Sequence, residues 1–428
     1  MLGKIIYKII LTITLTFNSL LFSATWKVFF YMDSSDDLSD MAIKNITDMV
    51  RTKPQDNIEL LIQLHAYHKA GLRYKVTKNS LTFLEEVELK GDPKQDLIDA
   101  SSWAFKDNKH DYTMLILSNH GWGILDPKYN SDTDQWQANA EPISNYCSLK
   151  YLEEHKKHKG FMFNKTTKNY LNNQELIGSL NYIKNNLLNG KNLDILAFDT
   201  CMGSMLEVAY QISPFVNYLV GNQSCSLPDG FDYQGVISAL NKKNNPINTI
   251  KDMVQAFDNY YKKNDSSGIY THAGLDLSST NEIKETLDAI VTQLLDIPEI
   301  NQILIKAQNN TPRFCMWPMY TDPIAFCKII EEQLDPIQGP SKIKALKQTL
   351  EKLYIIVEQA VVARCGGHTT QNLAYGFSIY LPMNIIDSSY YNTSFAKESK
   401  WLDLLKHLLQ NQIEQKPINF TPQNIKIN

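Results

Sequence analysis

The sequence predicts an α/β protein with a mostly parallel central sheet, helices on both of its faces, and a helical C-terminal subdomain completed by a returning strand. Two observations support this fold class. Short apolar runs, such as residues 113–117 and 194–198, are typical of strands buried on both faces of a parallel sheet. Between these runs lie segments whose apolar residues recur at helical spacing. Such β-α-β alternation favours a parallel sheet between two helical layers.

The first 298 residues supply most of the expected sheet. In chain order, we predict strands at 26–32, 57–64, 74–77, 82–87, 113–117, 194–198, 217–221 and 272–277, and helices at 38–50, 93–105, 173–188, 233–240, 247–261 and 279–295. The runs at 74–77 and 82–87 are separated by a short polar turn, which predicts a hairpin at a sheet edge. The helix at 93–105 begins with Pro93, a residue suited to a first turn.

The chain changes character near residue 299, beyond which prolines break it into short pieces. Helices are expected at 322–334 and 342–362, a strand at 374–381 and a closing helix at 401–409. We therefore predict two parts, an α/β domain at 24–298 and a helical subdomain with a returning strand at 299–428.

Residues 1–23 have the pattern of a signal peptide. Lys4 and Lys8 precede a charge-free apolar run, and the small residues Ser23 and Ala24 follow it. A membrane anchor is the alternative, but the run is shorter than the roughly 20 residues that a spanning helix needs. We expect a secreted or periplasmic protein with no membrane association after the signal is removed.

The composition excludes some classes of partner and cofactor. A hydrophobic content of 43% and a charged content of 21% are ordinary for a globular protein. The net charge of −4 offers no basic footprint for nucleic acid. The six cysteines do not form a disulfide framework typical of small secreted domains, and their spacing to histidines does not match metal ligands, so we expect no metal.

A cysteine and a histidine each follow the end of a predicted strand. Cys201 comes directly after Asp199-Thr200, and apolar residues at helical spacing begin at Met202. Ligands of α/β sheets bind at the carboxyl ends of strands, and a helix beginning at this point would favour the thiolate of Cys201. A buried structural cysteine is the alternative. His120 likewise follows the strand at 113–117, so if the two strands are neighbours the pair would face each other as base and nucleophile.

Several motifs together resemble the clostripain family of cysteine peptidases, which belongs to the caspase-like clan. They occur in the family's order, from about residue 26 to about residue 382: WKVFFYMDSSDDL at 26–38, NHG at 119–121, DTCMGSMLEVAY at 199–210, LPDGFDYQGVISAL at 227–240 and GFSIYLP at 376–382. The resemblance implies a caspase-like fold and a peptidase activity without a cofactor. Relatives differ in calcium dependence, and this sequence has no Asp-rich EF-hand loop.

The resemblance also implies roles for individual residues. Cys201 would attack the scissile carbonyl as a thiolate, and His120 would take and return the proton. The backbone N–H groups of Gly121 and Cys201 would stabilise the oxyanion. Asp199 and Asp229 match acidic positions that line a pocket for basic residues in similar enzymes. We therefore expect protein or peptide substrates with Arg or Lys before the cut.

Other interpretations remain open. Asp199 would equally suit a helix cap and Asp229 a turn. The family usually has a small residue where this chain has Trp122, and Asn222-Gln223-Ser224 stands where an acidic pair is common. A bulky ring beside the histidine would fit a catalytically inactive, caspase-fold binding protein, which is the alternative function. His272 is most simply a structural residue of its strand.

The polar segment at 126–170 joins the histidine strand to the cysteine strand. Long segments of this kind are usually functional or disordered. The resemblance to the clostripain family also implies a proenzyme that cuts itself after a basic residue. We predict an activation segment in this insertion, with Lys156 and Lys157 as the preferred site of self-cleavage and Lys150 and Lys159 as close rivals. An ordinary surface insertion is the alternative.

Overall fold

The structure is a computed structural model that describes residues 24–415 apart from short gaps at 35–37, 66–69, 127, 131–134, 138–160, 165–166, 168, 228, 299, 315–318 and 335–339. The predicted signal peptide at 1–23 lies outside the described residues, and so do Lys150, Lys156, Lys157 and Lys159.

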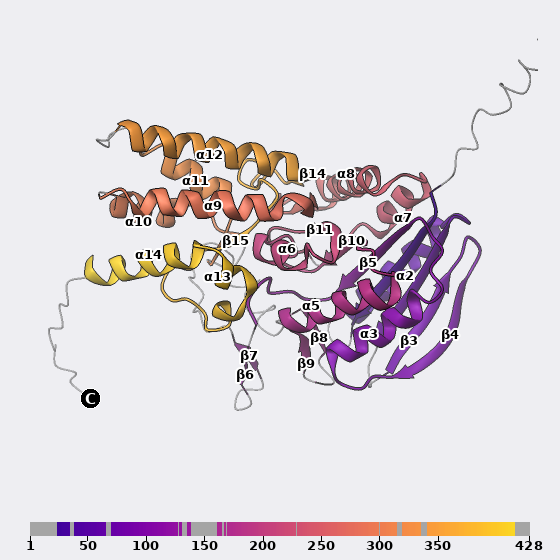
Figure 1. Cartoon of the computed structure of the whole chain (residues 1–428). Helices are drawn as coiled ribbons and strands as arrows, with labels where there is room; N and C mark the ends of the chain where they lie inside the picture. Colours follow the sequence, from indigo (N-terminus) through magenta and orange to yellow (C-terminus); the bar gives the residue numbers. More distant parts are fainter. Residues whose placement is uncertain are drawn as a thin grey trace, which may run out of the picture.

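Nine of the described strands form one sheet, in the order β14-β12-β11-β10-β5-β1-β2-β3-β4 (Figure 1). Their bounds are β1 Trp26–Asp33, β2 Ile58–His65, β3 Ala70–Val76, β4 Leu81–Glu88, β5 Tyr112–Ser118, β10 Leu193–Asp199, β11 Val216–Gly221, β12 Thr271–Asp276 and β14 Val361–Gly366. The five strands from β11 to β2 are parallel, and antiparallel pairs complete both margins. The predicted parallel sheet is confirmed at the centre, and the hairpin β3-β4 is at the predicted edge.

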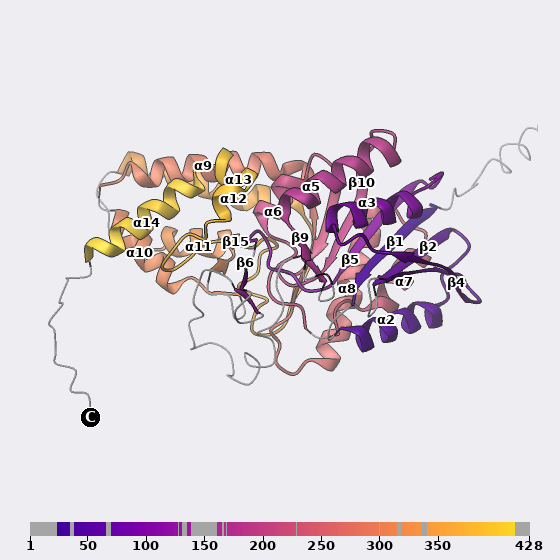
Figure 2. The ribbon, with the colours of Figure 1, turned by 90° about the horizontal axis from the view of Figure 1, so that it is seen from below.

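Helices cover both faces of the sheet, as the alternating pattern predicted (Figures 1 and 2). One layer contains α2 Ser39–Thr52, α7 Tyr233–Asn241 and α8 Pro246–Asn264, and the other contains α3 Pro93–Ala104, α5 Asn173–Tyr182 with the π-helical turn η1 Ile183–Leu187, and α6 Leu206–Ile212. Successive strand residues point to opposite layers, so Phe30 and Ala197 belong to one hydrophobic cluster and Phe29 and Phe198 to the other. Being covered twice explains why these strands are continuously apolar.

Local signals account for several helix starts. The Asp92 side chain accepts a hydrogen bond from the Gln95 N–H, with Pro93 in the first turn. Asn172 and Glu175 form a reciprocal capping box at the start of α5. These caps begin the helices that precede β5 and β10, the two strands of the site described below.

The C-terminal part is a lobe of helices beside the sheet (Figure 2). It comprises η2 Leu277–Ser279, α9 Thr280–Leu295, α10 Ile300–Asn310, α11 Pro323–Glu331, α12 Pro340–Ala360, η3 Tyr390–Asn392, α13 Ser394–Glu398 and α14 Trp401–Gln415. One continuous hydrophobic cluster contains both α5 residues of the sheet domain and α12 and α14 residues of this lobe.

The strand that returns to the large sheet differs from the predicted one. We predicted it at 374–381, but the returning strand is β14, which follows α12 without a break. Only β15 Ile379–Tyr380 is a strand in the predicted range, and it pairs with β13 Tyr320–Thr321. The preceding backbone is engaged elsewhere, because Ser378 exchanges hydrogen bonds with Ser204 and Leu206, beside the cysteine motif.

The insertion at 126–170 contains more regular structure than expected. Its described parts include β6 Lys128–Asn130, β7 Gln135–Gln137, β8 Phe161–Asn164 and β9 Asn169–Leu171, which form two small hairpins. Asp126 Oδ1 accepts hydrogen bonds from the backbone N–H and the side-chain amide of Asn173, at 3.3 and 3.2 Å. The two ends of the insertion are therefore tied to each other.

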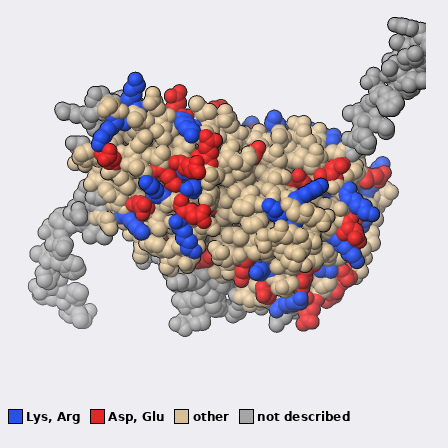
Figure 3. Space-filling model, viewed as in Figure 1, with Lys and Arg blue, Asp and Glu red and all other residues tan. Residues whose placement is uncertain are grey.

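Two surface properties bear on partners. On the face shown in Figure 3, acidic and basic side chains intermingle, with no single-sign area. Within the described ranges, no helix is long and apolar enough to cross a membrane.

Candidate active site

The histidine and cysteine motifs lie at the carboxyl ends of adjacent parallel strands. β5 pairs with β10 in a register that sets Ser118 beside Asp199, and His120 and Cys201 each come two residues later. Contact between the two strand ends is close, since a Cβ on Gly121 would lie 2.5 Å from the Cys201 carbonyl oxygen. Only glycine fits there. The neighbouring strands that the sequence interpretation required are thus present.

Asn119 holds the backbone of His120 in place. Its Oδ1 accepts a hydrogen bond from the His120 N–H at 2.5 Å, and its Nδ2 donates to the Asp33 carbonyl oxygen at 2.5 Å. The Asn119 N–H donates to the Asp199 carbonyl oxygen at 3.3 Å. Through its side chain and its backbone N–H, this buried residue therefore connects the ends of β1, β5 and β10. Asn119 stands in the NHG motif, but nothing in the sequence indicates this role.

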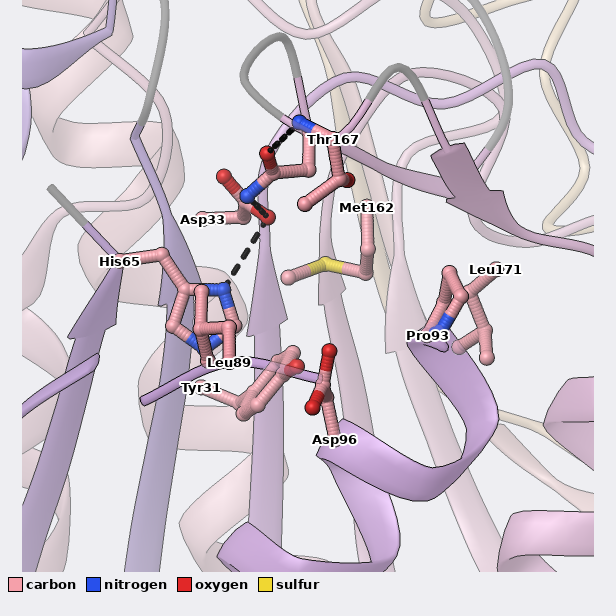
Figure 4. A pocket seen from close by; sticks show the side chains of 10 residues that line it. Tyr31, Asp33, His65, Leu89, Pro93, Asp96, Met162, Thr167 and Leu171 are labelled. Atoms are coloured by element: carbon pink, nitrogen blue, oxygen red, sulfur yellow. Dashed lines mark hydrogen bonds and ion pairs between the residues drawn. The ribbon is translucent and has the colours of Figure 1, made fainter. Parts of the chain in front are cut away.

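Asp33, at the end of β1, is held by a network of buried polar side chains (Figure 4). Its carboxylate Oδ2 accepts from Asn164 at 2.9 Å and lies 3.1 Å from His65 Nδ1. The Gln63 amide nitrogen contacts His65 Nε2 at 2.9 Å, while its oxygen accepts from Arg73. His65 Nε2 is therefore an acceptor, and the Nδ1 proton points at Asp33. The adjoining cavity of about 20 Å³ has room for a water molecule, not for a substrate.

The nucleophile candidate lies in a turn, which corrects one prediction. We expected a helix to begin directly after Cys201, but α6 begins at Leu206, and Met202 has a left-handed φ of 56°. The predicted stabilisation of the thiolate by a helix dipole is therefore wrong. Burial raises the pKa of the Cys201 thiol to about 11, and the charge of Asp199 acts in the same direction. The thiol needs a base to become a nucleophile.

Ser226 makes a direct contact with the sulfur that was not predicted. Its backbone N–H donates to Cys201 Sγ at 3.2 Å. This hydrogen bond lowers the pKa of the Cys201 thiol and so opposes the effect of burial. No sequence signal points to Ser226, because it acts through its backbone.

Asp199 lies buried beneath the loop that follows β11. Its Oδ2 accepts hydrogen bonds from the Tyr233 hydroxyl at 2.5 Å and from the Ser118 hydroxyl at 3.2 Å. Its Oδ1 makes no hydrogen bond within the described part of the chain. A Cβ on Gly230 would lie 2.7 Å from the carboxylate. Burial raises the pKa of Asp199 to about 6. The alternative interpretation as a helix cap does not hold, since Met205 precedes α6.

Asp229 lies on the same loop and next to Gly230. The Tyr260 hydroxyl donates to its Oδ2 at 2.6 Å, and a turn closes between Leu227 and Gly230. Asp229 therefore lies in a turn, as the alternative interpretation expected. Its carboxylate is half-buried, and the next residue, Gly230, lies against Asp199. The Tyr261 hydroxyl donates to the Gly230 carbonyl oxygen at 2.6 Å, and burial raises the pKa of Tyr261, with the charges of Asp199 and Asp229 acting in the same direction.

The other cysteines of the described ranges are accounted for by a disulfide and two free thiols. Cys225 is in a disulfide, and Cys327 and Cys365 are free thiols. The same ranges hold no cluster of three or more His, Cys, Asp or Glu suited to a metal ion.

Trp122, the bulky residue that favoured an inactive protein, is buried. Its carbonyl oxygen accepts a hydrogen bond from the Tyr320 hydroxyl at 2.6 Å, so this residue is part of the core packing.

The sheet order, the two helical layers and the paired strand ends define a caspase-like protein. A sequence profile of the clostripain family matches residues 143–408, which is more than half of the chain. The chain therefore belongs to the clostripain family, and it is a cysteine peptidase. The matched region contains Cys201, Asp199 and Asp229 and begins after His120. Comparison with curated proteins finds no match.

Solved structures agree on the fold. An inactive zymogen C11 protease from Parabacteroides distasonis is 17% identical, covers 88% of this chain and 98% of its own, and has a TM-score of 0.59. A secreted C11 cysteine protease from Bacteroides thetaiotaomicron is 14% identical, covers 89% and 99%, and has a TM-score of 0.61. The structure of a secreted C11 protease from that organism with an irreversible peptide inhibitor is 15% identical, covers 89% and 99%, and has a TM-score of 0.60.

Proposed function

We propose that this chain is an exported cysteine endopeptidase that cleaves after Arg or Lys, with Cys201 as nucleophile and His120 as the proton carrier. The observation that carries the proposal is the β5–β10 pairing, which packs Gly121 of the histidine motif against Cys201. Export is supported by the signal-like pattern at 1–23 and by the structural neighbour that is described as secreted.

The proposed reaction proceeds by acyl transfer. His120 removes the thiol proton of Cys201, and Sγ attacks the scissile carbonyl carbon. The backbone N–H groups of Gly121 and Cys201 donate to the oxyanion that forms. His120 then protonates the departing amine, the C–N bond breaks, and a thioester remains. Water, deprotonated by His120, hydrolyses the thioester and restores the thiol.

The two carboxylates support a preference for basic residues. Asp199 Oδ1 is buried and accepts no hydrogen bond of normal geometry within the described chain, although the Phe231 backbone lowers the pKa of the carboxyl, so a substrate cation would add the missing partner. Asp229 adds a second carboxylate next in the chain to Gly230, the residue that lies against Asp199. An Arg or Lys side chain entering under the loop would pair with both. A fluorogenic peptide panel that varies the residue before the cut tests this function directly, and preferential hydrolysis after neutral residues would reject it.

The preference for basic substrates should depend on pH. Because burial raises the pKa of Asp199 to about 6, the carboxyl is neutral below this pH and ionised above it. The ratio of kcat/KM for an Arg peptide to that for a neutral peptide should therefore fall as pH drops from 7 to 5. The ratio cancels any titration that both substrates share, including that of the catalytic pair. A pH-independent ratio would contradict the assignment, and Asp199→Asn should abolish the dependence.

Self-cleavage in the insertion should leave the two halves associated. The cut would fall between β5 and β10, and these strands pair directly in the sheet. Beyond the proposed site, the Asn164 side chain donates a hydrogen bond to Asp33 Oδ2 at 2.9 Å, and Asp33 belongs to the other half, at the end of β1. Purified wild-type protein is expected to run as two fragments on a denaturing gel and as one species in size-exclusion chromatography.

The control for processing is Cys201→Ala, which should remain one chain. Terminal sequencing locates the cut, and Lys156→Gln combined with Lys157→Gln should abolish or displace it. Catalytically active protein that stays a single uncut chain would reject the activation segment. The insertion would then be a surface feature.

A further inference from the structure

The turn that carries Cys201 is joined to the loop after β11 by three hydrogen bonds. The Met202 N–H donates to the Ser224 carbonyl oxygen at 3.0 Å, and the Ser204 N–H donates to the Asn222 carbonyl oxygen at 3.1 Å. The third bond is the one from the Ser226 N–H to Cys201 Sγ, at 3.2 Å. The position of the sulfur relative to its donor therefore depends on how firmly residues 222–226 are held.

Asn222 fixes this loop from inside. Its side chain is 1% exposed. Its Nδ2 donates to the Ser226 hydroxyl oxygen at 2.5 Å, and its Oδ1 lies 2.8 Å from His272 Nδ1. Because the amide nitrogen faces Ser226, the amide oxygen faces the ring, and His272 Nδ1 must carry a proton. An ordered chain of donors thus runs from His272 through Asn222 to Ser226.

His272 is an immobile end of this chain. Its ring is 2% exposed, stacks on Phe257 at 4.1 Å with an interplanar angle of 9°, and meets the edge of Phe231 at 4.8 Å. Burial lowers the pKa of His272 to about 3, so the ring is neutral at any pH where a peptidase of this kind works. His272 is paired with Cys365 of β14 in the antiparallel ladder. The structural role predicted for His272 therefore extends to the loop beside the nucleophile.

Ionisation of Cys201 depends on the fixed position of the Ser226 N–H. Burial makes the Cys201 thiolate costly, and the charge of Asp199 also opposes ionisation, while the proposed proton carrier His120 stands at the end of the adjacent strand. An N–H aimed at the sulfur becomes a charge-assisted hydrogen bond once the thiol ionises, and such bonds are about twice as strong as neutral ones. A loop that moved would lose this gain.

From these contacts we infer that Asn222 and His272 are positioning residues for the nucleophile, which act by holding the Ser226 amide on Cys201 Sγ. The inference rests on the proposed role of Cys201. It assigns a function to a histidine and an asparagine that lie 71 and 21 residues from the nucleophile in the chain, respectively (272 − 201 and 222 − 201).

The decisive variant is Ser226→Ala, which removes the hydroxyl that Asn222 holds and keeps the backbone N–H. The pH dependence of Cys201 alkylation by iodoacetamide, followed by mass spectrometry of the Cys201 peptide, reports thiolate formation without any substrate. We expect the midpoint to rise by about one pH unit, and the rate at pH 7 to fall about tenfold, as one lost orienting hydrogen bond would give. The kcat for peptides should fall similarly, with KM changed less than about twofold.

Two further variants test the chain upstream. His272→Phe keeps the stacked ring and loses the Nδ1 donor, so it should raise the midpoint as Ser226→Ala does. His272→Asn restores an N–H near that position and should return the midpoint towards wild type. As the matched control, His407→Phe breaks another His–Asn pair, in which His407 Nε2 lies 2.6 Å from Asn301 Oδ1 within the helical lobe. This control should leave the midpoint and kcat unchanged.

The outcomes separate this inference from the proposed function. An unchanged alkylation midpoint in Ser226→Ala would overturn the inference even if the enzyme is active. Peptide turnover by Cys201→Ala would overturn the proposed nucleophile, while the alkylation measurement would still decide whether Ser226 controls the thiol. If His272→Phe fails to fold, the alkylation midpoint of Ser226→Ala alone decides the inference, since the Ser226 side chain is only half-buried and its loss is tolerable.

Discussion

Replacing Cys201 by alanine should abolish peptide hydrolysis, and His120→Ala should cost nearly as much. The thiol of Cys201 is protonated in the free enzyme because burial raises its pKa to about 11. Without His120, the described end of β5 retains only Ser118 and Asn119, whose side chains do not act as bases at neutral pH. We expect each variant to lose about 10⁴-fold or more in kcat, since members of one catalytic unit each contribute nearly the whole effect.

The double variant Cys201→Ala with His120→Ala tests whether the two residues act as one catalytic unit. If Cys201 and His120 act as a unit, the double variant should be no slower than Cys201→Ala, because removing the base from an enzyme without a nucleophile costs nothing more. Matched controls are Cys365→Ala, which removes a free thiol on β14, and His110→Ala, which removes a half-buried histidine before β5. Both should retain kcat. Multiplicative losses, or turnover by Cys201→Ala, would show that the pair was wrongly assigned.

Asp199→Asn should reduce kcat/KM for Arg and Lys substrates by more than about tenfold and change that for neutral substrates far less. The reason is that a buried carboxylate paired with a cation contributes more than a neutral amide hydrogen bond. The fold should persist, because an Asn side chain has the same shape and the Tyr233 hydroxyl can still donate to its oxygen. Kinetics on three peptides that differ only in the residue before the cut measure the effect.

The control for this variant lies on the same strand. Asp194, at the opposite end of β10, accepts hydrogen bonds from Thr113 and is far along the strand from Cys201. Asp194→Asn should therefore leave the preference for basic residues unchanged. Asp229→Asn should have a smaller effect than Asp199→Asn, since its carboxylate is only half-buried. Equal losses on neutral and basic peptides would mean that Asp199 supports the fold and not the pocket.

Much of the fold is predictable from the sequence, because the strands at the centre of the sheet are buried away from water and must be apolar. The central strands of the sheet are covered on both faces, so their residues must be apolar without alternation, and β1, β5 and β10 are all found where such runs occur. The helix starts at Pro93 and Asn173 follow from local caps. Because strand ends collect at one edge of a parallel sheet, His120 and Cys201 can also be placed there from the sequence.

The sequence is less informative at the margins of the sheet and beyond residue 298. β14 follows α12 directly, so no turn signal separates a helix from a strand, and we predicted a helix to residue 362. The range 374–381 has the apolar pattern of a strand, but the backbone groups of Ser378 bond to the turn after Cys201. Propensity cannot tell which backbone partner a buried segment will meet.

The site itself divides in the same way. The residue types that carry chemistry, His120, Cys201 and Asp199, stand in local motifs and are visible in the sequence. Tertiary structure alone decided that Cys201 is partly buried and lies in a turn ahead of α6, because solvent exclusion and helix onset depend on the packing around Cys201. It also brought Ser226, Asn222 and His272 to the nucleophile, through backbone and amide hydrogen bonds between distant segments that leave no pattern in the chain.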